Sequence, residues 1–152
     1  MCFCFEGTSI VKFEVREEVK VGEKAVARIY DIVEQSRKGI THYELKNWSN
    51  WQSWSSKAFR DQFLKDLTAM SEGKRIKWVF SGHKMSREEI KRKILDALRE
   101  QSFMVEVTTL IEQPSVRQAL SDALGTDILE ATDLYTALKE DKVFNLIFDI
   151  TE

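Results

Sequence analysis

The sequence predicts an α/β protein in which helices flank a mixed β-sheet. Three observations carry this prediction. Residues 25–46 alternate apolar and polar side chains in the period-two manner of strands, interrupted by a turn that contains Gly39. Residues 56–71 follow with apolar side chains at helical spacing, and residues 75–81 alternate again. An order of strand, strand, helix and strand is typical of an α/β sandwich.

The first half of the chain divides into clear elements. Residues 1–5 and 8–20 favour strands, residues 25–34 and 41–46 form the predicted hairpin, and residues 47–55 have no regular period. The helix over 56–71 has one apolar face, and Gly73 follows it where a left-handed terminal residue is expected. Gln62 and Asp66 lie one turn apart on another face of this helix.

The second half is predicted from caps and breakers. Ser86 begins a capping box that opens a helix to about Gln101, and a second capping box at Ser115 opens a helix that stops at Gly125. A further helix is predicted over residues 127–139. Residues 103–110 and 143–150 are predicted strands.

Charge separates the chain into two parts. Overall, 23 Lys and Arg stand against 25 Asp and Glu, a net charge of −2. Residues 1–106 carry 20 basic and 16 acidic side chains, whereas residues 107–152 carry 3 and 9. We therefore expect a functional core over 1–106 and an acidic extension over 107–152, packed on the core and ordered. The alternative is that these acidic side chains only solvate the outer helix faces, which their spread at helical intervals favours.

Size and cysteine content exclude several classes. The chain is 152 residues long, of which 43% are hydrophobic, so it has enough apolar side chains for one packed domain. No apolar run approaches the roughly 20 residues of a membrane helix. Cys2 and Cys4 have no cysteine or histidine partner nearby, so neither a disulfide framework nor a zinc site is expected, and a reducing cytoplasm is the expected compartment.

Ionisable residues in the hairpin suggest a metal site. Glu44 and Lys46 are two apart on a strand and so share a face, and Asp31 on the preceding strand can face the same side. Mg²⁺ takes oxygen ligands and binds through one or two carboxylates. A lysine beside such an ion can orient an attacking water. An alternative interpretation is a cross-strand salt-bridge cluster on an exposed sheet face.

The pattern resembles a nuclease family. The hairpin carries an Asp on one strand and Glu-x-Lys on the next, in the segments Arg28-Ile-Tyr-Asp31 and Tyr43-Glu-Leu-Lys-Asn-Trp48. This pattern is similar to the core of the PD-(D/E)XK, or restriction-endonuclease-like, nucleases. It is particularly similar to nuclease toxin domains at the C-termini of contact-dependent growth-inhibition and other polymorphic toxins of bacteria. The resemblance covers about residues 22–100. In the family, a helix with an acidic residue usually precedes the Asp-bearing strand. Here that segment is predicted to be a strand, and Glu23 is the one residue that could replace the acid.

The resemblance implies roles and a biological setting. Asp31, Glu44 and the carbonyl of Leu45 would hold Mg²⁺ or Mn²⁺, Lys46 would orient the water, and Gln62 would face the site. The substrate would be DNA or structured RNA such as tRNA. The domain would reach the cytoplasm of a target bacterium as the C-terminal part of a larger secreted or surface protein, and a cognate immunity protein would block it. The alternatives are a non-catalytic binding or immunity-type module and a housekeeping repair or resolvase nuclease.

Other candidate residues have two interpretations each. A basic group is either a phosphate-binding patch, with the acidic extension facing away from it or touching a protein partner, or a solvated helix face; its members are Lys84, Arg87, Lys91, Arg92 and Lys93. His42 either reaches the substrate or is structural. Trp51 and Trp54 either stack on nucleobases or receive a protein partner, whereas Trp48 is expected in the core.

Overall fold

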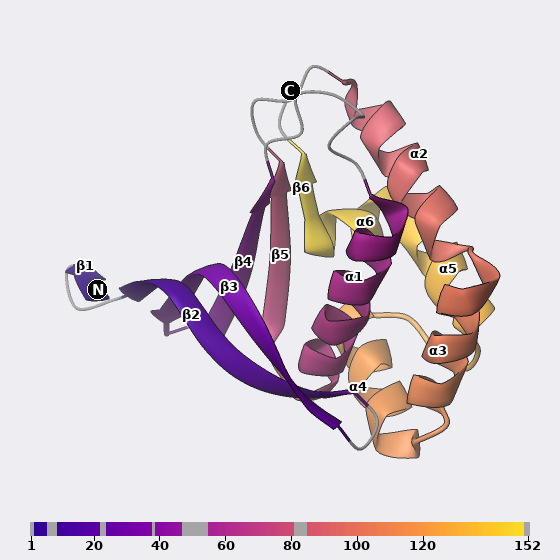
Figure 1. Ribbon diagram of the computed structural model, residues 1–152, viewed down its shortest axis with the longest axis horizontal. Helices are drawn as coiled ribbons and strands as arrows, with labels where there is room; N and C mark the ends of the chain where they lie inside the picture. The colour runs from indigo at the N-terminus through magenta and orange to yellow at the C-terminus, as the bar shows by residue number, and fades with distance from the viewer. Residues whose placement is uncertain are drawn as a thin grey trace.

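The computed structural model is an α/β fold, as the sequence predicts, with a mixed six-stranded sheet in the described part of the chain. It describes residues 2–5, 9–21, 24–37, 39–46, 55–80 and 85–150. Figure 1 shows the helices gathered on one side of a strongly curved sheet, with α1 (Ser56–Ser71) nearest to it.

The sheet contains an antiparallel half and a parallel half. The strands follow chain order: β1 (Cys2–Phe5), β2 (Ser9–Val21), β3 (Lys24–Ser36), β4 (Gly39–Lys46), β5 (Arg75–Phe80) and β6 (Phe148–Ile150). Neighbours from β1 to β4 are antiparallel, whereas β4, β5 and β6 run parallel. Parallel neighbours need a crossover, and α1 supplies the one between β4 and β5.

Helix α1 has the predicted bounds, and local chemistry explains them. The hydroxyl of Ser55 accepts a hydrogen bond from the Ala58 N–H at 3.2 Å, which satisfies one free amide of the first turn. Its apolar face buries Phe59, Phe63 and Leu67. Gly73 has a φ of 91°, so the chain reverses there at a residue without a Cβ and enters β5.

The later elements correct two strand predictions. Residues 103–110 belong to α3 (Gln101–Ile111). Of the strand predicted over 143–150, only β6 is extended, because the residues before it belong to α6 (Asp141–Ile147). The period-two pattern over 103–110 concealed a helical one, because the buried positions are Phe103, Val107, Leu110 and Ile111. The other helices are α2 (Arg87–Leu98), α4 (Pro114–Leu124) and α5 (Ala131–Lys139).

The caps explain where two of these helices begin. The Ser86 hydroxyl accepts from the Glu89 N–H at 3.2 Å, so the first predicted capping residue is confirmed. The second prediction is wrong. Helix α4 begins at Pro114, its N-cap is Gln113, and no side chain caps it. Proline has no amide hydrogen and its φ suits the first helical position, so the helix begins at Pro114 and Ser115 lies inside the first turn. None of the described helices is long and apolar enough to cross a membrane.

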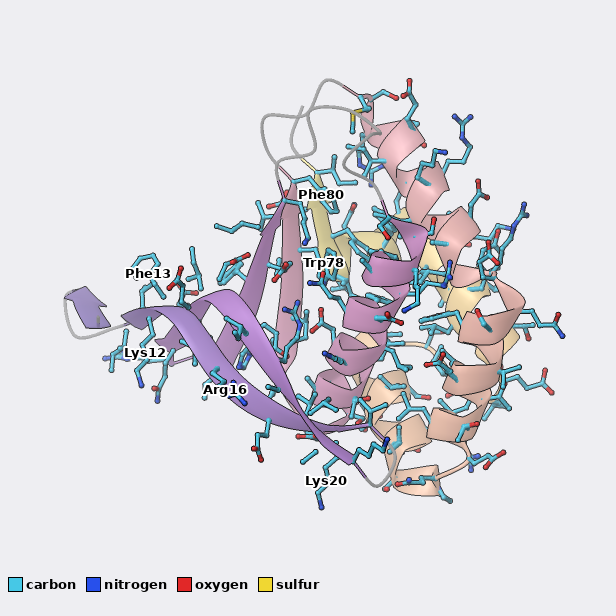
Figure 2. The ribbon with its side chains drawn as sticks, in the orientation of Figure 1. Lys12, Phe13, Arg16, Lys20, Trp78 and Phe80 are labelled. Carbon is cyan, nitrogen blue, oxygen red and sulfur yellow. The ribbon has the colours of Figure 1, made fainter. Side chains whose placement is uncertain are left out.

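One aromatic core joins both halves of the chain. Phe148 on β6 stacks on Phe63 of α1, with ring centroids 5.5 Å apart, and on Phe144 of α6 at 4.7 Å. Trp78 on β5 meets Phe59 edge to face at 5.1 Å, and Figure 2 places Trp78 between the sheet and α1. The boundary expected near residue 106 falls inside α3, and the acidic extension supplies a strand of the sheet.

Strands β3 and β4 pair over only part of their length. Their ladder runs from Ser36–Gly39 to Ile32–Tyr43. Strand β3 stays paired with β2 on its other side along its length, and β4 stays paired with β5 from Thr41 to Lys46, so each strand keeps its outer neighbour where the two part. The departure coincides with a distortion in β2, where Glu14 has a φ of 51°. The buried positions of β3 change phase here, from Arg28 and Tyr30 to Val33. Arg28 and Asp31 lie at this break, and both contact β4.

We predict that Phe148→Ala lowers the free energy of unfolding by about 3–5 kcal/mol, because it removes a fully buried ring from the aromatic core. Leu129→Ala is the control, since Leu129 is 66% exposed, and it should change that free energy by less than about 0.5 kcal/mol. Urea denaturation followed by circular dichroism measures both. Equal effects would show that the last strand is not part of the cooperative core.

Candidate active site

Three of the predicted catalytic side chains meet at the end of β4. Glu44 and Lys46 lie on the face of β4 that α1 covers, and Gln62 approaches them from α1. The Lys46 ammonium lies 2.9 Å from Glu44 Oε1 and donates to Gln62 Oε1 at 3.4 Å. Glu44 is buried, whereas the Lys46 side chain is 20% exposed. Lys46 also lies over the Trp78 ring, 5.3 Å from its centroid.

Asp31 joins this group through the backbone of β4. Its Oδ2 accepts a hydrogen bond from the Leu45 N–H at 2.8 Å. Asp31 therefore lies beside the one residue that separates Glu44 from Lys46, at the point where β3 leaves β4. The contact is to the main chain, and the Leu45 side chain itself is 46% exposed. The structure thus places all four predicted catalytic residues around three consecutive residues of β4.

Two further ionisable residues belong to the cluster and were missed as site residues. Arg28 Nη2 donates to Glu44 Oε2 at 3.1 Å, and Arg28 Nε donates to Asp66 Oδ1, also at 3.1 Å. Asp66 Oδ2 also accepts from the Trp78 indole N–H at 2.8 Å. Arg28 stands three residues before Asp31, and Asp66 stands one helical turn after Gln62. Those spacings were the available signals, but the contact between Arg28 and Asp66 spans 38 positions of sequence.

Burial and pairing compete in the electrostatics of this pair. Asp66 is fully buried, and this burial raises its pKa, although the charge of Arg28 and the bonds from Arg28 and Trp78 act in the opposite direction. Burial by itself lowers the pKa of Arg28. The negative charges of Asp66 and Glu44 outweigh that effect, so the pKa of Arg28 is raised and the guanidinium stays charged. Arg28, Lys46, Asp66 and Glu44 form a neutral set of two cations and two carboxylates.

The oxygen atoms in this group suit a hard cation. The carboxylates of Asp31 and Glu44, together with the Leu45 carbonyl, are the types and number of protein ligands that Mg²⁺ or Mn²⁺ takes alongside water and phosphate. Within the described ranges, no three His, Cys, Asp or Glu side chains gather as a ready-made metal cage. By the chemistry of its donors, the group fits an ion that keeps several water ligands.

The basic group has partners in the acidic extension. Lys91 is 9% exposed, and its ammonium lies 2.7 Å from Asp141 Oδ1 and donates to the Lys139 carbonyl at 2.8 Å. Arg87 Nη2 lies 3.2 Å from the same Asp141 oxygen. These two cations lower the pKa of Asp141, and the hydrogen bond from Lys91 has the largest effect. The expectation that the extension faces away from the basic group is therefore wrong, because Asp141 binds it. Arg92 is exposed.

The remaining candidates lie elsewhere. His42 is buried and contacts Glu17, its Nδ1 lies 3.4 Å from the Arg75 carbonyl, and its ring meets Tyr30 at 4.5 Å. Burial lowers the pKa of His42, although Glu17 acts to raise it. Other candidates lie outside the residues that the structure describes: Glu23, Trp48, Trp51, Trp54 and Lys84.

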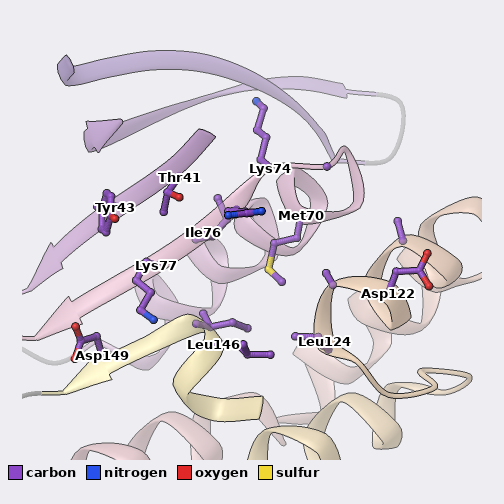
Figure 3. A pocket seen from close by; sticks show the side chains of 15 residues that line it. Thr41, Tyr43, Met70, Lys74, Ile76, Lys77, Asp122, Leu124, Leu146 and Asp149 are labelled. Atoms are coloured by element: carbon purple, nitrogen blue, oxygen red, sulfur yellow. The ribbon is translucent and has the colours of Figure 1, made fainter. Parts of the chain in front are cut away.

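A groove of about 850 Å³ opens at a separate place. Figure 3 shows it between β5, α6 and α4, where Lys77, Leu146 and Leu124 line it. The Lys77 ammonium there donates to the Asn145 carbonyl at 3.0 Å. None of the four predicted catalytic residues lines this groove. The ionisable cluster under α1 is therefore separate from this groove.

We predict that Asp66→Ala lowers the free energy of unfolding by about 3–5 kcal/mol, because it leaves Arg28 buried without its main partner. Asp61→Ala on the same helix is the matched control. Asp61 pairs with Lys57 in solvent, so its loss should cost less than about 0.5 kcal/mol. The measurement is urea denaturation of both variants. A small cost for Asp66→Ala would mean that the buried pair does not stabilise the fold.

His42 predicts a pH dependence of stability. Its pKa in the folded protein is below the usual 6.5, so the unfolded chain takes up a proton at a higher pH than the folded one. The stabilising effect of neutral His42 is complete above about pH 6.5 and is lost as the pH falls toward the lowered value. The stability difference between wild type and His42→Gln should therefore shrink between about pH 7.5 and pH 5.5. Thermal melts across this range test it; a difference that grows on acidification contradicts it.

Comparison with known proteins gives no assignment of this fold or site. No family model, curated protein or solved structure matches the chain. The geometry around Glu44 and the resemblance of the motif that contains it are therefore the grounds on which a function can be proposed.

Proposed function

We propose that this chain is a Mg²⁺- or Mn²⁺-dependent endonuclease of the PD-(D/E)XK type, which hydrolyses phosphodiester bonds in DNA or in structured RNA such as tRNA. One observation carries the proposal. Lys46 contacts both Glu44 and Gln62 at the carboxyl end of β4, which runs parallel to β5. Asp31 accepts a hydrogen bond from the backbone amide between Glu44 and Lys46. The carboxyl ends of parallel strands are where α/β sheets bind ligands.

The order of the elements supports the same proposal. Asp31 lies on the first strand of the hairpin, and Glu44 and Lys46 lie on the second. Helix α1 follows with Gln62, and β5 returns parallel to β4. This order resembles the PD-(D/E)XK core. Asp31 and Glu44 also lie just beyond the last pair of the β3–β4 ladder rather than within it.

The residues divide the chemistry among them. Asp31, Glu44 and the Leu45 carbonyl would hold the ion, which supplies stabilisation of the charge that develops on the phosphate and on the leaving oxygen. Lys46 orients the attacking water through its ammonium, and Gln62 fixes the direction of that ammonium by accepting one of its hydrogens. With the ion bound, Lys46 would release Glu44 Oε1 and keep Gln62 Oε1 as its acceptor.

The biological part of the proposal comes from the resemblance to bacterial growth-inhibition toxins. The domain would be the C-terminal part of a larger secreted or surface protein and would act in the cytoplasm of a competing bacterium. A cognate immunity protein would protect the producing cell. Toxicity on expression, relieved by a neighbouring small gene, separates this setting from that of a housekeeping repair or resolvase nuclease.

A non-catalytic module on the same scaffold is the second candidate. The observation in its favour is that Glu44 has an ionic partner on each oxygen, so the cluster is satisfied without an ion. Cleavage of nucleic acid that depends on Mg²⁺ separates the two candidates.

We predict that Glu44→Gln and Lys46→Met each lower the cleavage rate by about 10²–10⁴-fold while the protein stays folded, since each removes one chemical role and keeps much of the side-chain volume. Plasmid and total RNA, each incubated with pure protein and Mg²⁺, give the rates. The control is Asp61→Asn, one residue from Gln62 but paired only with exposed Lys57 among the described contacts, and it should cut at the wild-type rate. A Glu44→Gln protein that cleaves at the wild-type rate would refute the nuclease proposal.

A further inference from the structure

We infer that Arg28 is a fixed cation of the active site: it holds one oxygen of Glu44, so that the site takes a single divalent ion. The inference rests on the proposed function and deepens it, because the resemblance leaves open how many ions act. It follows from the different ways in which Arg28 and Lys46 hold the same carboxylate.

Arg28 is anchored through all three of its guanidinium nitrogens. Nε donates to Asp66 Oδ1 at 3.1 Å, and Nη1 donates to the Ile29 carbonyl at 2.7 Å. Nη2 donates to Glu44 Oε2 at 3.1 Å and to Asp66 Oδ2 at 3.4 Å. The planar fork of arginine matches this geometry, which a lysine ammonium cannot reproduce. Arg28 thereby fixes Glu44 to β3 and to α1 at once.

Arg28 cannot leave Glu44 as Lys46 can. The Arg28 side chain is 5% exposed, and its departure would leave the fully buried Asp66 carboxylate without its cation. The Lys46 side chain is 20% exposed and reaches Glu44 through a single ammonium. Glu44 Oε1 is therefore the oxygen that Lys46 would release to a divalent ion, whereas Oε2 would stay with Arg28. A second ion bridged by Glu44 would need the oxygen that Arg28 holds.

The charge of the cluster agrees with one ion. Two cations, Arg28 and Lys46, stand with three carboxylates, Asp31, Glu44 and Asp66, which leaves a formal charge of −1. One divalent ion together with the single negative charge of a phosphodiester neutralises this set. A second divalent ion would leave two uncompensated positive charges beside the buried Arg28, which is unfavourable where the dielectric is low.

Direct binding of Mn²⁺ to the full chain tests the number of ions. Electron paramagnetic resonance counts free Mn²⁺ in a titration of the wild type and of Glu44→Gln, without nucleic acid. We expect one bound ion per wild-type chain and at least tenfold weaker binding to Glu44→Gln. Two bound ions that are both weakened in Glu44→Gln, or none in the wild type, would overturn the inference. This count does not depend on how any Arg28 variant folds.

Arg28→Lys tests the role of the fork, because it retains the charge and removes the bidentate geometry. We expect its Mn²⁺ affinity to fall by about 10–100-fold, as when a residue that orients a metal ligand is changed. Arg99→Lys is the matched control: Arg99, the C-cap residue of α2, pairs with Asp96 in solvent, and its substitution should leave the affinity unchanged. Wild-type affinity in folded Arg28→Lys would contradict the positioning role.

The binding experiment tests the single-ion inference, the cleavage experiment tests the nuclease proposal, and either one can fail without the other. A wild-type chain that cuts nucleic acid but binds two Mn²⁺ through Glu44 refutes the single-ion inference and leaves the nuclease proposal in place. A chain that binds one Mn²⁺ through Glu44 and cuts neither DNA nor RNA refutes the nuclease proposal and retains the single-ion site.

Discussion

The ion pair between Arg28 and Asp66 is the constraint on which the rest of the candidate site depends. A carboxylate as deeply buried as Asp66 is tolerated only with a charged, hydrogen-bonded partner, and Arg28 supplies it across the space between β3 and α1. The same guanidinium reaches Glu44 on β4, and Trp78 on β5 donates to Asp66. One buried pair therefore fixes three strands against one helix, and it orients the carboxylate at the centre of the proposed chemistry.

The divergence of β3 and β4 explains why so many charges gather at this place. In a continuous ladder, the covered face between two strands is filled by apolar side chains. Here the ladder ends at Ile32–Tyr43, and Glu14 on the neighbouring strand adopts a positive φ at the same level. Asp31 uses its carboxylate to satisfy the Leu45 amide that no longer has a β3 partner in the described ladder. Sparsely populated backbone conformations of this kind concentrate at functional sites.

The sequence predicted those parts of the fold that depend on neighbouring residues. The hairpin, α1 and β5 follow from periodicity, and the shared face of Glu44 and Lys46 follows from their spacing on one strand. The prediction of a strand over 103–110 was wrong because the apolar residues there fit both a period of two and a helical period, and only packing in the folded chain selects the helix. Contacts between distant residues have no local signal. The pairing of Arg28 with Asp66, and of Lys91 with Asp141, required the folded chain.

The ion pairs on both oxygens of Glu44 are compatible with the proposed catalytic role, because the two cations differ in the free energy that their departure would cost. Arg28 is held by a buried carboxylate and a backbone carbonyl, so it belongs to the scaffold. Lys46 is partly exposed and has a second acceptor in Gln62, to which it can remain bonded when it leaves Glu44. The fold thus fixes one oxygen of Glu44 and leaves the other exchangeable. Such a carboxylate is preorganised for a ligand without being locked against it.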